Sequence, residues 1–118
     1  KVDCGADYIV TQMFFDNKHY FKFVEQCNKI GIKIPIIPGI KILSLERHLE
    51  ALPKHFYLNL PKELIKSVEG KSKSEIRNSG IDWATSQIQE LIDRGVPCIH
   101  FYIMSSAKSA TKVVSNFI

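Results

Sequence analysis

The chain has 118 residues, of which 45% are hydrophobic and 24% charged, and it carries a net charge of +4. This length allows one domain with one sizeable core, and the composition is ordinary for a soluble globular chain. No apolar run reaches the roughly 18 residues of a membrane helix, and no secretory leader opens the chain. The lysines are interleaved with acidic residues, without a basic stripe carrying aromatic side chains. We therefore expect neither a membrane nor a nucleic acid as a partner.

Cysteine and histidine usage points to a reduced, metal-free protein. Cys4, Cys27 and Cys98 are an odd number without paired spacing, and we expect buried, reduced thiols in a cytoplasmic protein. The four histidines are scattered, so no metal site is predicted. The chain also lacks an initiator methionine and begins only a few residues before its first strand, which favours a piece of a longer chain.

The first predicted element is a strand over about residues 8–13. Its continuous run of β-branched and aromatic residues indicates burial on both faces, as in a parallel sheet covered by helices. The polar residues Thr11 and Gln12 stand at its exit. Asp16 is a good N-cap for the helix that follows, and Gly31 suits the residue just past its end. That helix carries one apolar face, formed by Tyr20, Phe23, Val24, Cys27 and Ile30.

A second strand is predicted over about residues 34–40, and Pro38-Gly39 forces an abrupt exit from it. Ser44 can cap a short helix that Pro53 would end. Pro61 suits the first position of another helix. The two strands and the helix between them therefore form a βαβ unit, followed by a helical connection.

The remaining chain repeats the pattern of helix and strand. Ser72 and Glu75 match a capping box at the start of a long amphipathic helix, in which Gly80 predicts a break near the start. A third apolar strand follows over about residues 98–104. The last predicted helix spans about residues 108–117.

Three apolar strands, each followed by helix, predict an α/β fold with a parallel sheet. A complete open sheet of this kind would leave two strongly apolar edge strands uncovered. We therefore predict that residues 1–118 are the C-terminal portion of a TIM (β/α)₈ barrel, about three β/α units holding its last three strands. Active groups of such barrels stand at the carboxyl ends of the strands, which here means Thr11, Gln12, the exit after Gly39, and residues 104–106.

Several side chains could carry chemistry, and each has a simpler structural alternative. The carboxamide of Gln12 could pair with a heterocycle, or it could satisfy a neighbouring backbone group. His48 could face the barrel mouth, or it could be a solvent-facing helix residue. His100 is more readily a hydrogen-bonded core histidine than a catalytic one, and Lys1 more readily a surface lysine than a phosphate ligand. Phe14-Phe15 is more readily packing than a stacking platform. No Ser-His-Asp set, phosphate loop or carboxylate pair is present.

Three motifs carry a resemblance to a known family. They are the opening run K-V-D-C-G-A-D-Y-I-V-T-Q-M-F-F-D (residues 1–16), Ile36-Ile37-Pro38-Gly39-Ile40, and His100-Phe101-Tyr102. In order and spacing these resemble the methylenetetrahydrofolate reductase family, and the similarity covers essentially the whole chain. The first motif is specific, whereas the third would be weak on its own.

The resemblance implies a barrel that binds FAD and reduces 5,10-methylenetetrahydrofolate to 5-methyltetrahydrofolate with NAD(P)H, in a cytoplasmic homo-oligomer. It implies that Lys1 contacts the flavin and that Gln12 contacts the folate. His48 stands where the family often has a substrate-contacting glutamine. The family's catalytic acidic residues lie on earlier strands, so we assign no catalytic residue to this chain and expect the segment alone to be inactive.

Two departures from the family pattern leave an alternative open. His48 cannot copy the pairing of an amide, and Ser106 stands where the last strand commonly ends in an arginine. These differences favour a non-catalytic barrel fragment or a folate-like ligand-binding module as the alternative. Another flavin or phosphate barrel enzyme would need a glycine-rich turn after the last strands, which Ser105-Ser106-Ala107 does not supply.

Overall fold

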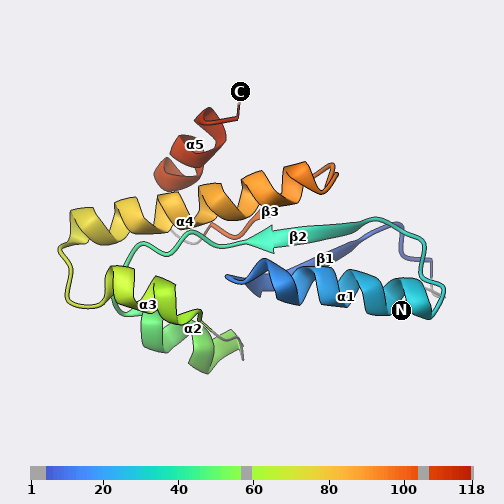
Figure 1. Cartoon of the computed structure of the whole chain (residues 1–118), viewed down its shortest axis with the longest axis horizontal. Coiled ribbons are helices and arrows are strands. Elements are labelled where there is room, and N and C mark those ends of the chain that lie inside the picture. Colours follow the sequence, from blue (N-terminus) through green and yellow to red (C-terminus); the bar gives the residue numbers. More distant parts are fainter. Residues whose placement is uncertain (1–4, 57–59, 104–106, 118) are drawn as a thin grey trace.

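The computed structural model describes residues 5–56, 60–103 and 107–117. Its strands β1 (Ile9–Phe14), β2 (Ile36–Ile40) and β3 (His100–Phe101) form one parallel sheet in the order β1-β2-β3 (Figure 1). The predicted α/β fold with a parallel sheet is confirmed. The first two strands agree with the predicted ranges to within the usual uncertainty of strand ends. The third was expected over about residues 98–104, but the sheet pairing described for it is confined to two residues.

In the described part of the chain, five helices connect and cover the strands, and α4 lies between α3 and α5 (Figure 1). Their bounds are α1 (Asn17–Lys29), α2 (His48–Phe56), α3 (Lys62–Val68), α4 (Lys73–Asp93) and α5 (Lys108–Ser115). Within the described ranges, no helix is both long and apolar enough to cross a membrane.

The predicted helix starts at Asp16 and Ser72 are confirmed by their hydrogen bonds. The Asp16 carboxylate accepts the backbone N–H of Lys18 at 3.0 Å. The Ser72 hydroxyl accepts the N–H of Glu75 at 3.2 Å and donates to the Glu75 carboxylate at 3.1 Å. Each side chain thus occupies a backbone donor that the first helical turn leaves without a partner.

Two helix predictions are wrong, one for the helix after the second strand and one for the long helix α4. The helix expected to start after Ser44 and end at Pro53 is α2, which begins only at His48 and continues through Pro53. A proline inside a helix removes its own N–H bond and does not prevent the chain from continuing. The break expected at Gly80 is also absent, because α4 is continuous. A Cβ atom at Gly80 would overlap the backbone carbonyl of Leu43, so glycine is required there by a close approach.

One face of the sheet is covered by α1, α4 and α5. The apolar side chains buried there, which we call the sheet core, are Phe14, Tyr20, Ile40, Ile42, Ile81, Ala84, Ile88, Leu91, Ala110 and Val113. They come from strands β1 and β2, the segment just after β2, and the three covering helices. The apolar face predicted for α1 is confirmed only in part. Tyr20 and Cys27 are buried and Val24 packs against the sheet core, whereas Phe23 and Ile30 are exposed.

A second group of buried side chains lies at and beyond the carboxyl ends of β1 and β2. We call it the α2–α3 cluster, and it consists of Met13, Phe15, Leu43, Leu52, Leu64, Val68 and Ile76. Burial of Phe14 and Phe15 confirms that this pair packs in the interior. The cluster joins α2 and α3 to the start of α4, at the edge of the sheet where the candidate site lies.

The other face of the sheet is uncovered over part of its area, contrary to the predicted burial on both faces. Tyr8, Val10 and His100 are exposed there. Cys98, expected to be buried, is exposed as well, whereas Cys27 is a buried free thiol on α1 as predicted. The difference arises because the helices of this chain cover a single face of the sheet.

Candidate functional site

The exit of β1 is an irregular stretch that displays Thr11 and Gln12. The pairing of β1 with β2 shifts register between Val10 and Met13, as a bulge does. The Thr11 hydroxyl accepts the N–H of Gly39 at 2.9 Å, which ties the two strands together beside the shift. Gln12 is exposed, and its carboxamide oxygen accepts the N–H of Met13 at 3.2 Å. Gln12 therefore does satisfy a neighbouring backbone group, which was its structural alternative. This hydrogen bond leaves the amide NH₂ group as a donor for a ligand.

Tyr102 braces the exits of all three strands. Its hydroxyl donates to the backbone oxygen of Thr11 at 2.7 Å, and its ring passes over Gly39. A Cβ atom at Gly39 would lie 2.5 Å from the Tyr102 Cε2 atom and 2.6 Å from the Thr11 oxygen, so this crossing needs glycine. The sequence reasoning did not single out Tyr102 as a site residue, although its two-residue spacing from His100 places both on one face of the strand.

His100 is not the core histidine that the sequence predicted. Its side chain is exposed, and its ring meets the Tyr102 ring edge-on with 4.7 Å between centroids. The physical reason is the strand's alternation: Ile99 and Phe101 pack on the sheet core, so His100 points to the uncovered face.

His48 is the first residue of α2, and its ring is half-buried rather than solvent-facing. The Nδ1 atom accepts the backbone N–H groups of Ser44 and Leu45, both at 3.3 Å. Burial, followed by the charges of Lys41 and Arg47, lowers the His48 pKa to about 4. The ring is therefore neutral near pH 7 with its proton on Nε2, an assignment that follows from the hydrogen bonds, and it can present one donor to a ligand.

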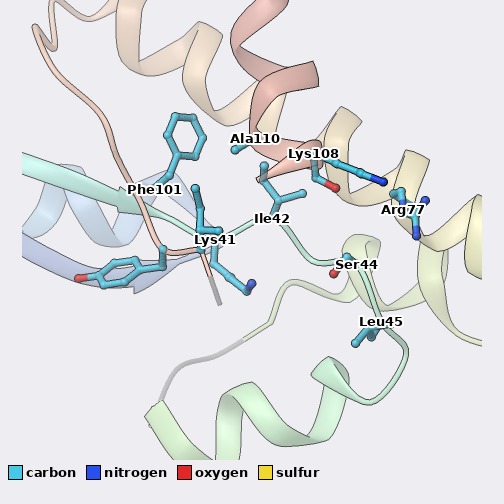
Figure 2. A pocket seen from close by; sticks show the side chains of 11 residues that line it. Lys41, Ile42, Ser44, Leu45, Arg77, Phe101, Lys108 and Ala110 are labelled. Atoms are coloured by element: carbon cyan, nitrogen blue, oxygen red, sulfur yellow. The ribbon is translucent and has the colours of Figure 1, made fainter. Parts of the chain in front are cut away.

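A cavity of about 280 Å³ opens beside the exits of β2 and β3 (Figure 2). Lys41 follows β2 directly, Tyr102 follows β3, and Arg77 reaches the cavity from α4. The sequence reasoning missed both basic residues. A lysine placed immediately after the apolar run Ile36–Ile40 was the available signal for Lys41, whereas nothing in the local sequence places Arg77 at this edge.

Within the described ranges, the predicted site residues do not form a single contacting cluster. Gln12 and His48 stand at different strand exits, and no hydrogen bond joins them there. Lys1 and Ser106 lie outside the described residues. In the described ranges, no group of three or more His, Cys, Asp or Glu side chains could hold a metal ion.

This arrangement defines a class of protein: an α/β domain with polar side chains at the carboxyl ends of parallel strands, where such folds bind their ligands. The sequence model of the methylenetetrahydrofolate reductase family matches residues 1–117. The chain therefore belongs to the methylenetetrahydrofolate reductase family.

Relatives from plants, animals and bacteria bear the same family name. The chain is 36% identical over 118 residues to methylenetetrahydrofolate reductase (NADH) 1 of Arabidopsis thaliana, a match covering 98% of this chain and 20% of the plant protein. It is 29% identical over 119 residues to a probable methylenetetrahydrofolate reductase (NADPH) of Caenorhabditis elegans, with 98% and 18% covered.

A third similar protein is the 5,10-methylenetetrahydrofolate reductase of Salmonella typhimurium, 32% identical over 110 residues, with 92% of this chain and 37% of the bacterial protein covered. The chain thus spans about a fifth of the length of the plant and animal relatives and just over a third of the bacterial one.

Proposed function

We propose that this chain forms the last three β/α units of a (β/α)₈ barrel in an enzyme that reduces 5,10-methylenetetrahydrofolate to 5-methyltetrahydrofolate with FAD and NADH or NADPH. The observation that carries the proposal is the family match over residues 1–117. The strands are parallel in the order β1-β2-β3, with helices on one face of the sheet and the other face uncovered. This supports the barrel, because the inner faces of barrel strands pack against one another and not against helices. We further propose a cytoplasmic homo-oligomer, as the resemblance implies.

Gln12 is the proposed folate contact. Its carboxamide oxygen is held by the N–H of Met13, which orients the side chain and leaves its NH₂ group to donate to an acceptor on the pterin. The bulge that holds it is bonded to β2 through Thr11 and to the end of β3 through Tyr102. A side chain positioned by three strands loses little conformational freedom when substrate binds.

His48 is the second proposed folate contact. Its Nδ1 atom is occupied by two backbone N–H groups, so the ring approaches substrate with an Nε2–H donor alone. A family member with glutamine at this position offers both a donor and an acceptor. We therefore expect this protein to make one hydrogen bond here, to an acceptor on the substrate.

A bound flavin would supply the hydride-transfer chemistry between the nicotinamide and the folate. Lys1 is the one residue of this chain proposed to contact it, and it lies outside the described residues. The contribution proposed for residues 5–117 is to bind and orient the folate at the carboxyl ends of the strands.

The proposal is tested in the protein at the full length in which the cell makes it. Gln12→Ala should raise the KM for methylenetetrahydrofolate at least about tenfold, because a buried substrate acceptor loses its donor. The rate of flavin reduction by NAD(P)H should stay unchanged. Gln26→Ala is the matched control, because Gln26 is an exposed glutamine on α1, away from the strand exits.

Two outcomes would contradict the proposal. Tight folate binding without turnover by the unaltered protein would favour the non-catalytic folate-binding module instead. Flavin-dependent NAD(P)H oxidation by purified residues 1–118 would contradict the expectation that catalysis needs strands beyond this chain.

A further inference from the structure

The backbone that follows Gln12 is held by two side chains of α4. The amide NH₂ group of Gln87 donates to the backbone oxygen of Phe14 at 3.2 Å, and the indole N–H of Trp83 donates to that of Phe15 at 2.7 Å. The two donors are one helical turn apart and so lie on the same face of α4. Their bonds join residues 73 and 68 positions apart, so the exit of β1 is fastened to a separate, long helix.

Asn17, the first residue of α1, extends this connection. Its side chain is buried, and its Nδ2 atom donates to the backbone oxygen of Gln87 at 3.0 Å and to the Glu90 carboxylate at 2.8 Å. Its Oδ1 atom accepts the amide of Gln87 at 3.2 Å. The segment that leads from β1 into α1 is therefore bonded to α4 at Phe14, Phe15 and Asn17.

Gln87 makes these bonds at a cost to its own acceptor. The residue is 5% exposed, and in the described part of the chain no hydrogen-bond partner is found for its Oε1 atom. A buried polar atom without a partner is destabilising, and an apolar side chain of similar size would avoid that cost. The bonds that the NH₂ group makes to Phe14 and Asn17 offset it.

The other side of Gln12 is held as well. The Tyr102 hydroxyl donates to the backbone oxygen of Thr11 at 2.7 Å. A bonded carbonyl thus precedes Gln12 at Thr11 and another follows at Phe14, with only Met13 between Gln12 and the second. A side chain on a short segment that is fixed at both ends has few orientations open to it.

We propose that Gln87 and Trp83 are positioning residues for Gln12. They hold the exit of β1 from α4, so that the Gln12 carboxamide meets the folate already oriented. This inference rests on the proposed function for the identity of the ligand. Immobilising one flexible side chain on binding weakens affinity about two- to tenfold, and a segment ordered before the ligand arrives avoids that loss.

Two variants test the proposal in the protein at its natural full length. Gln87→Met and Trp83→Phe each remove one donor and keep an apolar side chain in its place. Each should raise the KM for methylenetetrahydrofolate about two- to tenfold. The rate of flavin reduction by NAD(P)H should stay unchanged, because the folate contact of Gln12 is not used in that step.

Two controls separate loss of position from loss of stability. Gln89→Met changes an exposed glutamine of the same helix, which bonds to Asp93 and not to the exit of β1, and it should leave the KM unchanged. Ser72→Ala removes the cap of α4 and should lower the melting temperature. It should also leave the KM unchanged.

A double-mutant cycle tests whether α4 acts through Gln12. In a Gln12→Ala background, Gln87→Met should raise the KM no further, because the group that it orients is already absent. Hydrogen exchange gives a second readout that needs no substrate. The amide of Met13, which donates to the Gln12 carboxamide, should exchange faster in Gln87→Met and in Trp83→Phe than in the unaltered protein.

The proposal is overturned if neither variant raises the KM, if Gln87→Met raises it equally with and without Gln12, or if exchange at Met13 is unchanged in both variants. An equal rise in KM for Ser72→Ala would also overturn it. If Gln87→Met does not fold, Trp83→Phe decides the question in the same cycle. If the unaltered protein does not turn over methylenetetrahydrofolate, the proposed function is refuted, and exchange at Met13 still decides whether α4 holds Gln12.

Discussion

The sheet core and the α2–α3 cluster are built differently, although both consist of buried apolar side chains. Long, periodic elements form the sheet core: α1 and α4 each cover several strand positions with side chains at helical spacing. Shorter pieces form the α2–α3 cluster, because α2 has 9 residues and α3 has 7. Helices of that length are unstable alone in water, so their stability comes from the cluster itself.

The candidate site depends on the α2–α3 cluster, whose short helices have the lower intrinsic stability. His48 begins α2, and Lys41 lies on the segment that runs from β2 into the α2–α3 cluster. Leu43 packs in that cluster and also meets α4 at Gly80. The contact between Leu43 and Gly80 is therefore where the sheet core, through α4, holds the site in place.

The largest expected effect follows from this contact. Gly80→Ala should lower the free energy of unfolding by about 3 kcal/mol or more, because the new Cβ atom overlaps the Leu43 carbonyl. Alanine in a helix would otherwise gain about 1 kcal/mol over glycine, so the sign of the change is diagnostic. Urea unfolding of the variant measures it.

The matched control is Asn78→Ala, an exposed position two residues earlier on α4. It should leave stability unchanged or slightly raised. A stabilised Gly80→Ala protein would mean that the segment after β2 does not pack against α4.

Leu64 and Leu91 compare the two regions directly, because both are 0% exposed. Each leucine-to-alanine change should cost about 3 kcal/mol. We expect Leu91→Ala, in the sheet core, to lower hydrogen-exchange protection across the chain. Leu64→Ala, in the α2–α3 cluster, should lower protection chiefly in α2 and α3. Equal loss of protection in α1 from both variants would show that the two regions unfold as one unit.

His48 makes the α2–α3 region sensitive to acid. Its pKa is about 4 in the folded protein and 6.5 in the unfolded chain, so the unfolded state binds more protons between these values. The stability that His48 contributes is present above pH 6.5 and is lost as the pH falls toward 4. Because the ring is only half-buried, we expect a loss of about 1–2 kcal/mol.

Two substitutions isolate this effect in urea unfolding at a series of pH values. His48→Gln can still accept the N–H groups of Ser44 and Leu45 and should remove the pH dependence. His48→Ala should remove both the dependence and the hydrogen bonds. An unchanged pH profile in His48→Gln would place the acid sensitivity on another group.

The smallest effects concern the two caps. Asp16→Ala and Ser72→Ala should each cost about 1 kcal/mol, since each exposes backbone donors in a first helical turn. Asp16→Asn and Ser72→Thr keep a capping oxygen and should restore most of that stability. Thermal unfolding detects the difference, and a loss that the capping variants do not restore would argue against the caps.

Much of the candidate site was accessible from sequence because it follows strand exits. Thr11 and Gln12 were found by their position after an apolar run, and the structure places them in a bulge at that exit. Tyr102 and Arg77 were missed, because their roles depend on contacts across 91 residues to Thr11 and on a cavity shared with β2. No local pattern encodes such contacts.

The sequence by itself determined the elements: apolar runs specify strands, 3.6-residue spacing specifies α1 and α4, and Asp16 and Ser72 specify where helices start. It also determined the parallel α/β class and, through its motifs, the family. Only the tertiary structure decided that Gly80 is a contact rather than a break, and that Lys41 is buried in a basic cavity. The reason is that periodicity reports which face of an element is apolar, whereas these features depend on which distant backbone or charge packs against that face.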